Sequence, residues 1–196
     1  MRASSAGRRG GWRSLRRLMV VAVWAGVAVP AAAARAQRPV LVGVAGGVSI
    51  PAGELGDGVD PGWHALGTIG ISTLMQPLGL RLDVAYNQFA FDDDLEAAVG
   101  ESGHQSTASA TLNASYRLPM TNSPLSPYLI SGLGAYRSEC SAGPGCDATT
   151  RFGWNVGLGT RLYLLGFRSF LEARYHRTER GDADVHYFPV TFGIVF

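Results

Sequence analysis

The feature that most constrains this chain is a two-residue alternation of apolar and polar side chains, which recurs along most of its length. In the final segment, Phe188, Phe192 and Phe196 fall on one face, and Thr191 and Gly193 fall on the other. Successive side chains of a β-strand point to opposite faces, so this period predicts strands with one apolar face each. The chain is therefore expected to consist mainly of such strands.

Segments of strand character are separated by turn-forming residues, and we count eight. They lie at 40–50, 62–74, 79–91, 104–118, 127–137, 151–164, 167–178 and 185–196. The shorter connections contain Gln76-Pro77, Pro119 to Pro127 and Leu165-Gly166, and the longer ones cover 51–61, 92–103, 138–150 and 179–184. An even strand count with short periplasmic turns and long outer loops is typical of bacterial membrane barrels. We predict an all-β fold, an eight-stranded antiparallel up-and-down transmembrane β-barrel.

The first 36 residues are predicted to be a secretory signal. A basic region precedes the apolar run 18–29, and Ala34-Arg35-Ala36 matches a cleavage site. The alternative is a retained anchor helix, but this run is shorter than the roughly 20 apolar residues that a spanning helix needs. We expect cleavage before Gln37, which leaves residues 37–196 as one barrel domain.

Removal of this segment changes the charge of the protein. The precursor carries a net charge of +2, but the signal holds seven arginines and no acidic residue. The mature chain then has 10 arginines against 15 acidic residues, a net charge of −5. Nucleic-acid binding therefore has no electrostatic support.

A soluble barrel is the main alternative fold, because the same alternation fits a lipocalin-like ligand-binding barrel with an apolar interior. The export signal, the strand lengths and the aromatic residues near strand ends favour the membrane. The aromatic side chains expected in two interfacial girdles are Trp63, Tyr86, Phe91, Tyr116, Tyr128, Tyr136, Trp154, Phe170, Tyr175, Phe188 and Phe196.

Two segments carry a resemblance to known proteins. The final strand, Phe188-Pro-Val-Thr-Phe192-Gly-Ile-Val-Phe196, resembles the signal that the barrel-insertion machinery reads, and the segment from Pro127 to Tyr136 resembles a common strand of small barrels. The pattern is similar to the outer-membrane β-barrel families of the OmpA transmembrane-domain, OmpX and opacity-protein type. The resemblance covers nearly all of residues 37–196.

This resemblance implies a bacterial outer-membrane location, contact with outer-membrane lipid and a monomeric state. It also implies that the barrel-assembly machinery recognises the C-terminal strand through Phe188, Phe192, Ile194 and Phe196. No peptidoglycan-binding domain follows Phe196, so the resemblance does not imply an anchoring role of the full-length OmpA kind.

Charged residues on the polar strand faces are expected to point into a narrow lumen. They are Arg81, Asp83, Arg117, Arg161, Glu172 and Arg174. Eight strands enclose a space that side chains can just fill, and charges in such a space should pair. We expect a structural plug of salt bridges, with a gated or ion-selective low-conductance channel as the alternative.

Other chemistry is sparse in the sequence. Cys140 and Cys146 lie in one predicted loop of an exported chain, so we expect a disulfide. The four histidines are scattered over different segments, so neither a metal site nor a cofactor is predicted. An enzyme would need a nucleophile beside a base. The candidates are Ser106 or Ser109 with His104 or His176, but no nucleophile motif surrounds the serines, and we do not predict an enzyme.

Acidic residues are concentrated in the longer connections. They are Glu54, Asp57, Asp60, Asp92, Asp93, Asp94, Glu96, Glu101, Glu179, Asp182 and Asp184. They are expected to form a solvated outer surface, with divalent-cation binding as the alternative. Because no site converges in the sequence, we expect a structural or surface-interaction role.

Overall fold

A computed structural model describes residues 40–72, 77–119, 125–143, 146–164, 166–180 and 183–196. The predicted signal, residues 1–36, lies outside the described residues. The strands are β1 (Val40–Ala52), β2 (Gly62–Ser72), β3 (Leu78–Ala90), β4 (His104–Arg117), β5 (Ser126–Cys140), β6 (Thr149–Leu164), β7 (Phe167–Arg180) and β8 (Ala183–Val195). Two short helices lie in the connections, the 3-10 helix η2 (Gly53–Asp57) and the α-helix α2 (Asp93–Val99).

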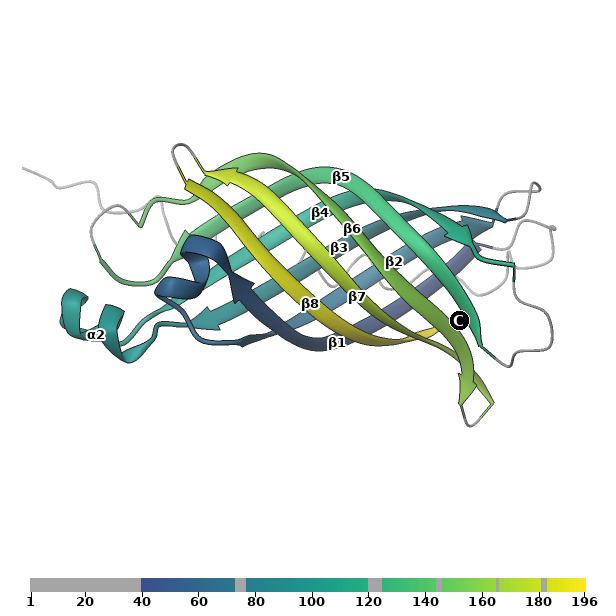
Figure 1. The fold of residues 1–196 in the computed structure, drawn as a ribbon, viewed down its shortest axis with the longest axis horizontal. Helices are drawn as coiled ribbons and strands as arrows, with labels where there is room; N and C mark the ends of the chain where they lie inside the picture. Colours follow the sequence, from purple (N-terminus) through teal and green to yellow (C-terminus); the bar gives the residue numbers. More distant parts are fainter. Residues whose placement is uncertain (1–39, 73–76, 120–124, 144–145, 165, 181–182) are drawn as a thin grey trace, which may run out of the picture. The chain divides into compact units, whose positions relative to one another are not determined.

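The strands form a closed barrel in which each strand pairs antiparallel with the next. The barrel closes between β1 and β8, where Val48 lies opposite Val190. Figure 1 shows the strands strongly tilted, with η2 and α2 at the same end of the barrel. No helix among the described residues is long and apolar enough to cross a membrane. The predicted eight-stranded up-and-down barrel is confirmed.

The barrel is polar inside and apolar outside. On β3, Leu82 is 47% exposed whereas the neighbouring Asp83 is 2% exposed. The same pattern, with the apolar side chain outside and the polar side chain inside, holds on β4, where Leu112 is exposed and Asn113 is buried. A soluble barrel has the opposite polarity, since its apolar side chains fill the interior. The lipocalin-like alternative, which would be recognised by an apolar interior, is therefore not the arrangement observed along the strands.

Four aromatic residues that we assigned to the girdles instead point into the barrel. Phe91, Tyr128, Tyr136 and Phe170 are buried, so this part of the prediction is wrong. The segment around Tyr128 has few polar residues, and its alternation therefore did not reveal which face is inside. Exposed aromatic residues remain at Trp63, Tyr86, Tyr116, Trp154, Phe188 and Phe196, and Tyr175 is half-buried.

Glycines on neighbouring strands make room for the interior aromatic rings. Gly193 lies opposite Phe170, and a Cβ atom at Gly193 would come within 2.4 Å of that ring. Gly159 lies opposite Tyr128, and a Cβ atom there would come within 2.6 Å of the Tyr128 side chain. These strand glycines therefore allow large side chains to fill a lumen that eight strands leave narrow.

The connections at the two ends of the barrel differ in length, as predicted. Two details of the outer connections were not predicted. The acidic segment after β3 forms α2, in which the Asp92 side chain accepts a hydrogen bond from the Leu95 backbone N–H at 2.7 Å. This N-cap explains a helix that we had not predicted. The predicted long connection at 179–184 is instead short, because β7 continues to Arg180 and β8 begins at Ala183. Short turns face the periplasm in bacterial barrels, so the η2 and α2 end faces outward.

Candidate functional site in the barrel interior

An ionic network crosses the interior at the level of Arg81. Arg81 and Asp83 come from β3, and Glu172 and Arg174 come from β7, four strands away around the barrel. Arg81 Nη2 lies 2.8 and 3.0 Å from the two Glu172 carboxylate oxygens, and Arg174 Nη2 lies 2.7 Å from Asp83 Oδ2. Arg81 Nε also contacts Asp83, at 2.9 Å, and Arg174 Nε contacts Glu172. The four side chains therefore form a ring of alternating charge.

This ring is electrically balanced and almost dry. Two arginines face two carboxylates, and the side chains of Asp83, Glu172 and Arg174 are at most 2% exposed. Removing charges from water is unfavourable unless each one has close partners of opposite sign. Every member here contacts two opposite charges, so the ring is a closed set that would be strongly unbalanced by the loss of one member.

Neutral side chains from the strands between β3 and β7 complete the network. Tyr128 donates its hydroxyl proton to Glu172 Oε2 at 2.6 Å. Asn113 donates to Asp83 Oδ2 at 3.0 Å, and Asn155 donates to Asn113 Oδ1 at 2.9 Å. In the sequence, Asn113 alternates with Leu112 and Ala114, and Asn155 alternates with Trp154 and Val156, which indicates the polar face for both; no such signal marks Tyr128.

The other two predicted lumen arginines lie closer to the periplasmic end. Arg117 is the last residue of β4 and lies opposite Tyr128 on β5. The Arg161 guanidinium lies over the Tyr128 ring, 5.3 Å from its centroid. Both arginines line a cavity of about 300 Å³ that adjoins the ionic ring at Arg81. The six predicted residues thus divide into a balanced ring of four and a separate pair of arginines.

A neutral polar layer lies on the outward side of the ring. His64 is hydrogen-bonded to Thr191 Oγ1 at 2.8 Å and to Ser49 Oγ at 3.2 Å, and the Ser49 hydroxyl donates to Asn87 Oδ1 at 2.7 Å. The buried His176 is hydrogen-bonded to the Tyr136 hydroxyl at 3.0 Å. These contacts satisfy polar groups that the barrel removes from water.

An apolar cluster closes the outward end of the interior. Its buried members are Leu55, Val59, Phe89, Phe91, Tyr136, Val185 and Tyr187. The rings of Phe89 and Tyr187 meet edge to face with centroids 5.9 Å apart. Leu95 of α2 packs against the cluster, so the outer connections help to cover it.

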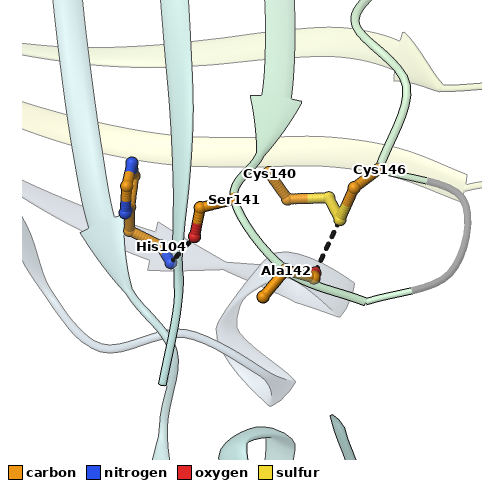
Figure 2. The surroundings of a disulfide bond; sticks show 5 residues. All are labelled: His104, Cys140, Ser141, Ala142 and Cys146. Carbon is orange, nitrogen blue, oxygen red and sulfur yellow. Dashed lines mark hydrogen bonds between the residues drawn. A yellow bond between two sulfur atoms is a disulfide. The ribbon is translucent and has the colours of Figure 1, made fainter. Parts of the chain in front are cut away.

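The predicted disulfide between Cys140 and Cys146 is confirmed. Figure 2 shows that Cys140, the last residue of β5, is bonded to Cys146 across the outer connection. Next to it, the Ser141 hydroxyl accepts a hydrogen bond from the His104 backbone N–H at 2.8 Å. The bridge ties the connection to the end of β5, and this hydrogen bond ties it to the start of β4.

The residues considered for catalysis or metal binding do not assemble into a reactive site. Ser109 is buried on the interior face of β4, whereas Ser106 is buried but belongs to the opposite face of that strand, and His176 is engaged with Tyr136. The described part of the chain contains no group of three or more His, Cys, Asp or Glu residues that could hold a metal ion.

A closed barrel with an apolar outer surface and charges paired inside is the arrangement of a transmembrane β-barrel. Comparison with protein families gives a match to the outer membrane protein beta-barrel domain over residues 19–196. The chain belongs to this family, and it is a protein of the bacterial outer membrane, surrounded there by membrane lipid. A search of curated proteins gave no significant match.

Solved structures of outer-membrane barrels are similar to this fold. Neisserial surface protein A has 19% sequence identity and a TM-score of 0.58, with 80% of this chain and 95% of that chain covered. A major outer membrane protein from Thermus thermophilus has 13% identity and a TM-score of 0.56, with 80% of this chain and 98% of that chain covered. At these identities the likeness concerns the fold alone.

Proposed function

We propose that this protein is a monomeric outer-membrane barrel with a structural or surface-interaction role, whose lumen is plugged and whose loops face the exterior. The observation that carries the proposal is the ionic ring of Arg81, Asp83, Glu172 and Arg174, which spans the interior from β3 to β7. A plugged barrel has no transport path, and the exposed loops are then its means of contact with other molecules.

The ring and the apolar cluster act in series against an ion path. A hydrated ion moving through the ring would have to separate paired charges that have little access to water. Beyond the ionic ring it would meet the apolar cluster, in which the buried side chains of Phe89, Phe91 and Val185 offer no hydrogen bonds to replace its hydration shell. This double closure favours the structural role over the low-conductance channel.

The outer connections are ordered enough to present a fixed surface. η2 packs near β8, α2 is capped by Asp92, and the disulfide ties the connection after β5. Acidic residues at exposed positions, including Asp57, Asp93 and Asp94, give this surface a negative charge. A partner that binds this surface directly would therefore be expected to carry positive charge.

Planar-bilayer recording of the purified barrel tests the plug. We expect no steady unitary conductance from the native protein, and we expect brief openings from a Glu172→Ala, Arg174→Ala double variant. The matched control is Glu139→Ala, Arg137→Ala, which removes one acid and one base from exposed positions of β5. Stable ohmic steps from the native barrel would contradict the plug and establish the channel alternative.

We also propose that residues 1–36 are removed on export and that the final strand directs insertion. Mass spectrometry of protein from the outer-membrane fraction should give a mature N-terminus at Gln37. A Phe196→Ala variant should accumulate as unfolded protein that does not change its gel mobility on boiling. A retained N-terminus, or normal insertion of this variant, would contradict the respective proposal.

A further inference from the structure

The hairpin formed by β6 and β7 extends past the barrel wall at the periplasmic end. Its two strands pair with each other as far as Leu164 opposite Phe167. In contrast, β6 pairs with β5 only as far as Arg161, and β7 pairs with β8 only from Arg168 onward. Figure 1 shows this hairpin standing apart from the other strand ends at that end of the barrel. We call the described residues within 162–168 the hairpin tip.

Both faces of the hairpin tip expose large hydrophobic side chains. Tyr163 lies opposite Arg168 on one face, and Leu164 lies opposite Phe167 on the other. Tyr163 is 75% exposed, more than any other large hydrophobic side chain that the structure describes, and Phe167 is 54% exposed. A cluster of this kind, uncovered by the protein itself, indicates contact with a membrane or with a partner.

The hairpin tip is continuous with the lipid-facing surface of the barrel. On β6 the exposed side chains of Val156 and Leu158 belong to the outer face, and the same alternation leads to Leu164. On β7 the exposed Leu171 belongs to the outer face, and the same alternation leads back to Phe167. Because the surface that meets lipid runs without a break into the tip, lipid is the expected neighbour there too.

The hairpin tip also carries positive charge. Arg168 is exposed, and the segment 159–171 contains two arginines but no aspartate or glutamate. The other arginine, Arg161, lies over the Tyr128 ring inside the barrel. An arginine at a lipid boundary can keep its alkyl stem on apolar surface while its guanidinium stays among polar groups. Arg168 therefore gives the tip a cation beside its hydrophobic side chains.

We propose that the hairpin tip lies in the headgroup region of the inner lipid leaflet and binds anionic phospholipid there through Arg168. The short turns are at the periplasmic end, which borders that leaflet. A tyrosine such as Tyr163 suits this region, because its ring is apolar and its hydroxyl is polar. The guanidinium fork matches the oxygens of a phosphate group, and a negative surface potential attracts the charge.

The small size of the hairpin tip favours lipid over a protein partner. Its six described residues are far fewer than the roughly 20–30 that each side of a stable protein interface supplies. A lipid headgroup needs only a few contacts at any one time. The site does not depend on the proposed function, because the tip lies outside the barrel wall whether or not the lumen conducts.

Tryptophan fluorescence in vesicles of brominated phospholipid tests the insertion. Trp63 and Trp154 are the only tryptophans in residues 37–196, so a Trp63→Phe, Trp154→Phe barrel can carry one reporter, Tyr163→Trp. We expect strong quenching by lipids brominated near the headgroup and weak quenching by aqueous acrylamide. The matched reporter is Ala97→Trp, at an exposed position of α2, and acrylamide should quench it instead. This control shows whether a tryptophan by itself draws a segment into lipid.

Brominated phosphatidylglycerol and brominated phosphatidylcholine separate the effect of charge from that of depth. The Tyr163→Trp reporter should associate with the anionic lipid about fivefold more strongly, which corresponds to about 1 kcal/mol. Adding Arg168→Gln should remove most of this preference, and Arg168→Lys should keep part of it. Arg151→Gln is the matched control, since Arg151 is exposed near the opposite end of β6, and it should leave the preference unchanged. Heat-modifiable gel mobility verifies that each variant is folded.

Two results would overturn the proposal. A tip reporter that acrylamide quenches and brominated lipid does not reach would place the tip in water and make a soluble partner the alternative occupant. Equal association with the two lipids, or a preference that Arg168→Gln leaves unchanged, would show that Arg168 does not bind anionic headgroups.

Discussion

Arg81 and Glu172 meet across the barrel interior, with Arg81 Nη2 at 2.8 and 3.0 Å from the two carboxylate oxygens. One residue lies on β3 and the other on β7, so the contact links opposite sides of a cylinder in which the strand pairing joins each strand only to its two neighbours. The ionic ring therefore acts as an internal cross-brace as well as a plug.

Loss of the Glu172 charge should destabilise the barrel. The change Glu172→Gln keeps the shape of the side chain but leaves Arg81 and Arg174 with one carboxylate between them. Breaking a buried ion pair in this way removes about 3–5 kcal/mol of stability. Urea unfolding in lipid vesicles, followed by tryptophan fluorescence, measures the change. Glu139→Gln, at an exposed position, should have little effect, and an equally small effect of Glu172→Gln would show that the ring does not brace the barrel.

A methyl group at Gly193 should disturb the packing of Phe170. The Cβ atom of Gly193→Ala would lie 2.4 Å from the Phe170 ring, so the ring has to move within a filled interior. Overpacking of this kind usually lowers stability by about 1–3 kcal/mol. The control is Gly67→Ala, since a Cβ atom there meets nothing within 4 Å.

The same unfolding assay measures both glycine variants. A second change, Phe170→Leu, should recover part of the stability lost in Gly193→Ala because it shortens the side chain that clashes. Equal stabilities for Gly193→Ala and Gly67→Ala would contradict the close fit between Gly193 and Phe170.

An arginine substituted on the outer face should lower the stability of the barrel more, the deeper its position lies in the bilayer. Leu82 lies near the middle of β3 and Tyr163 near the end of β6, and both are exposed. An arginine at the bilayer midplane lowers barrel stability by about 2–4 kcal/mol, against about 0–1 near the interface. Unfolding from lipid vesicles should therefore show a larger loss for Leu82→Arg than for Tyr163→Arg. The reverse order would require a different position of the barrel in the bilayer.

Reduction of the disulfide should loosen the outer connection without opening the barrel. A Cys140→Ser, Cys146→Ser variant loses the constraint on a short loop, which contributes at most about 2–3 kcal/mol. We expect faster protease cleavage within residues 141–148 and unchanged heat-modifiable mobility. Loss of that mobility shift would show that the bridge is needed for the strands to fold.

The sequence alone could predict which charged residues face the interior but not which of them meet. Alternation assigns Arg81, Asp83, Glu172 and Arg174 to the polar face, because side-chain direction depends only on the strand period. Their pairing depends on the register of seven strand pairs and one closing pair, which a single sequence does not encode locally. The ring of four and the separate pair formed by Arg117 and Arg161 therefore became visible only in the structure.

Tyr128 shows a second limit of the sequence pattern. Its neighbours Pro127 and Leu129 are apolar, so the alternation that identifies the inner face is absent there. The aromatic ring of Tyr128 enters the lumen because Gly159 on β6 leaves room for it. This fit is a relationship between two strands, which the pattern along one strand does not reveal. Asp92 is a different case, since its capping role is local, and the acidic residues that follow it in α2 are favourable at a helix N-terminus.

The seam between β1 and β8 has a consequence for the order of assembly. Phe196 donates its backbone N–H to the Val42 carbonyl at 2.8 Å, so this seam joins β1 to the strand that lies furthest from it in the sequence. Until that bond forms, each of the two strands presents a bare edge that can pair with other chains. Contacts between such distant parts of a chain also form slowly. The nascent polypeptide must therefore be shielded throughout its journey across the periplasm, and the hazard of aggregation ends only when the cylinder is sealed.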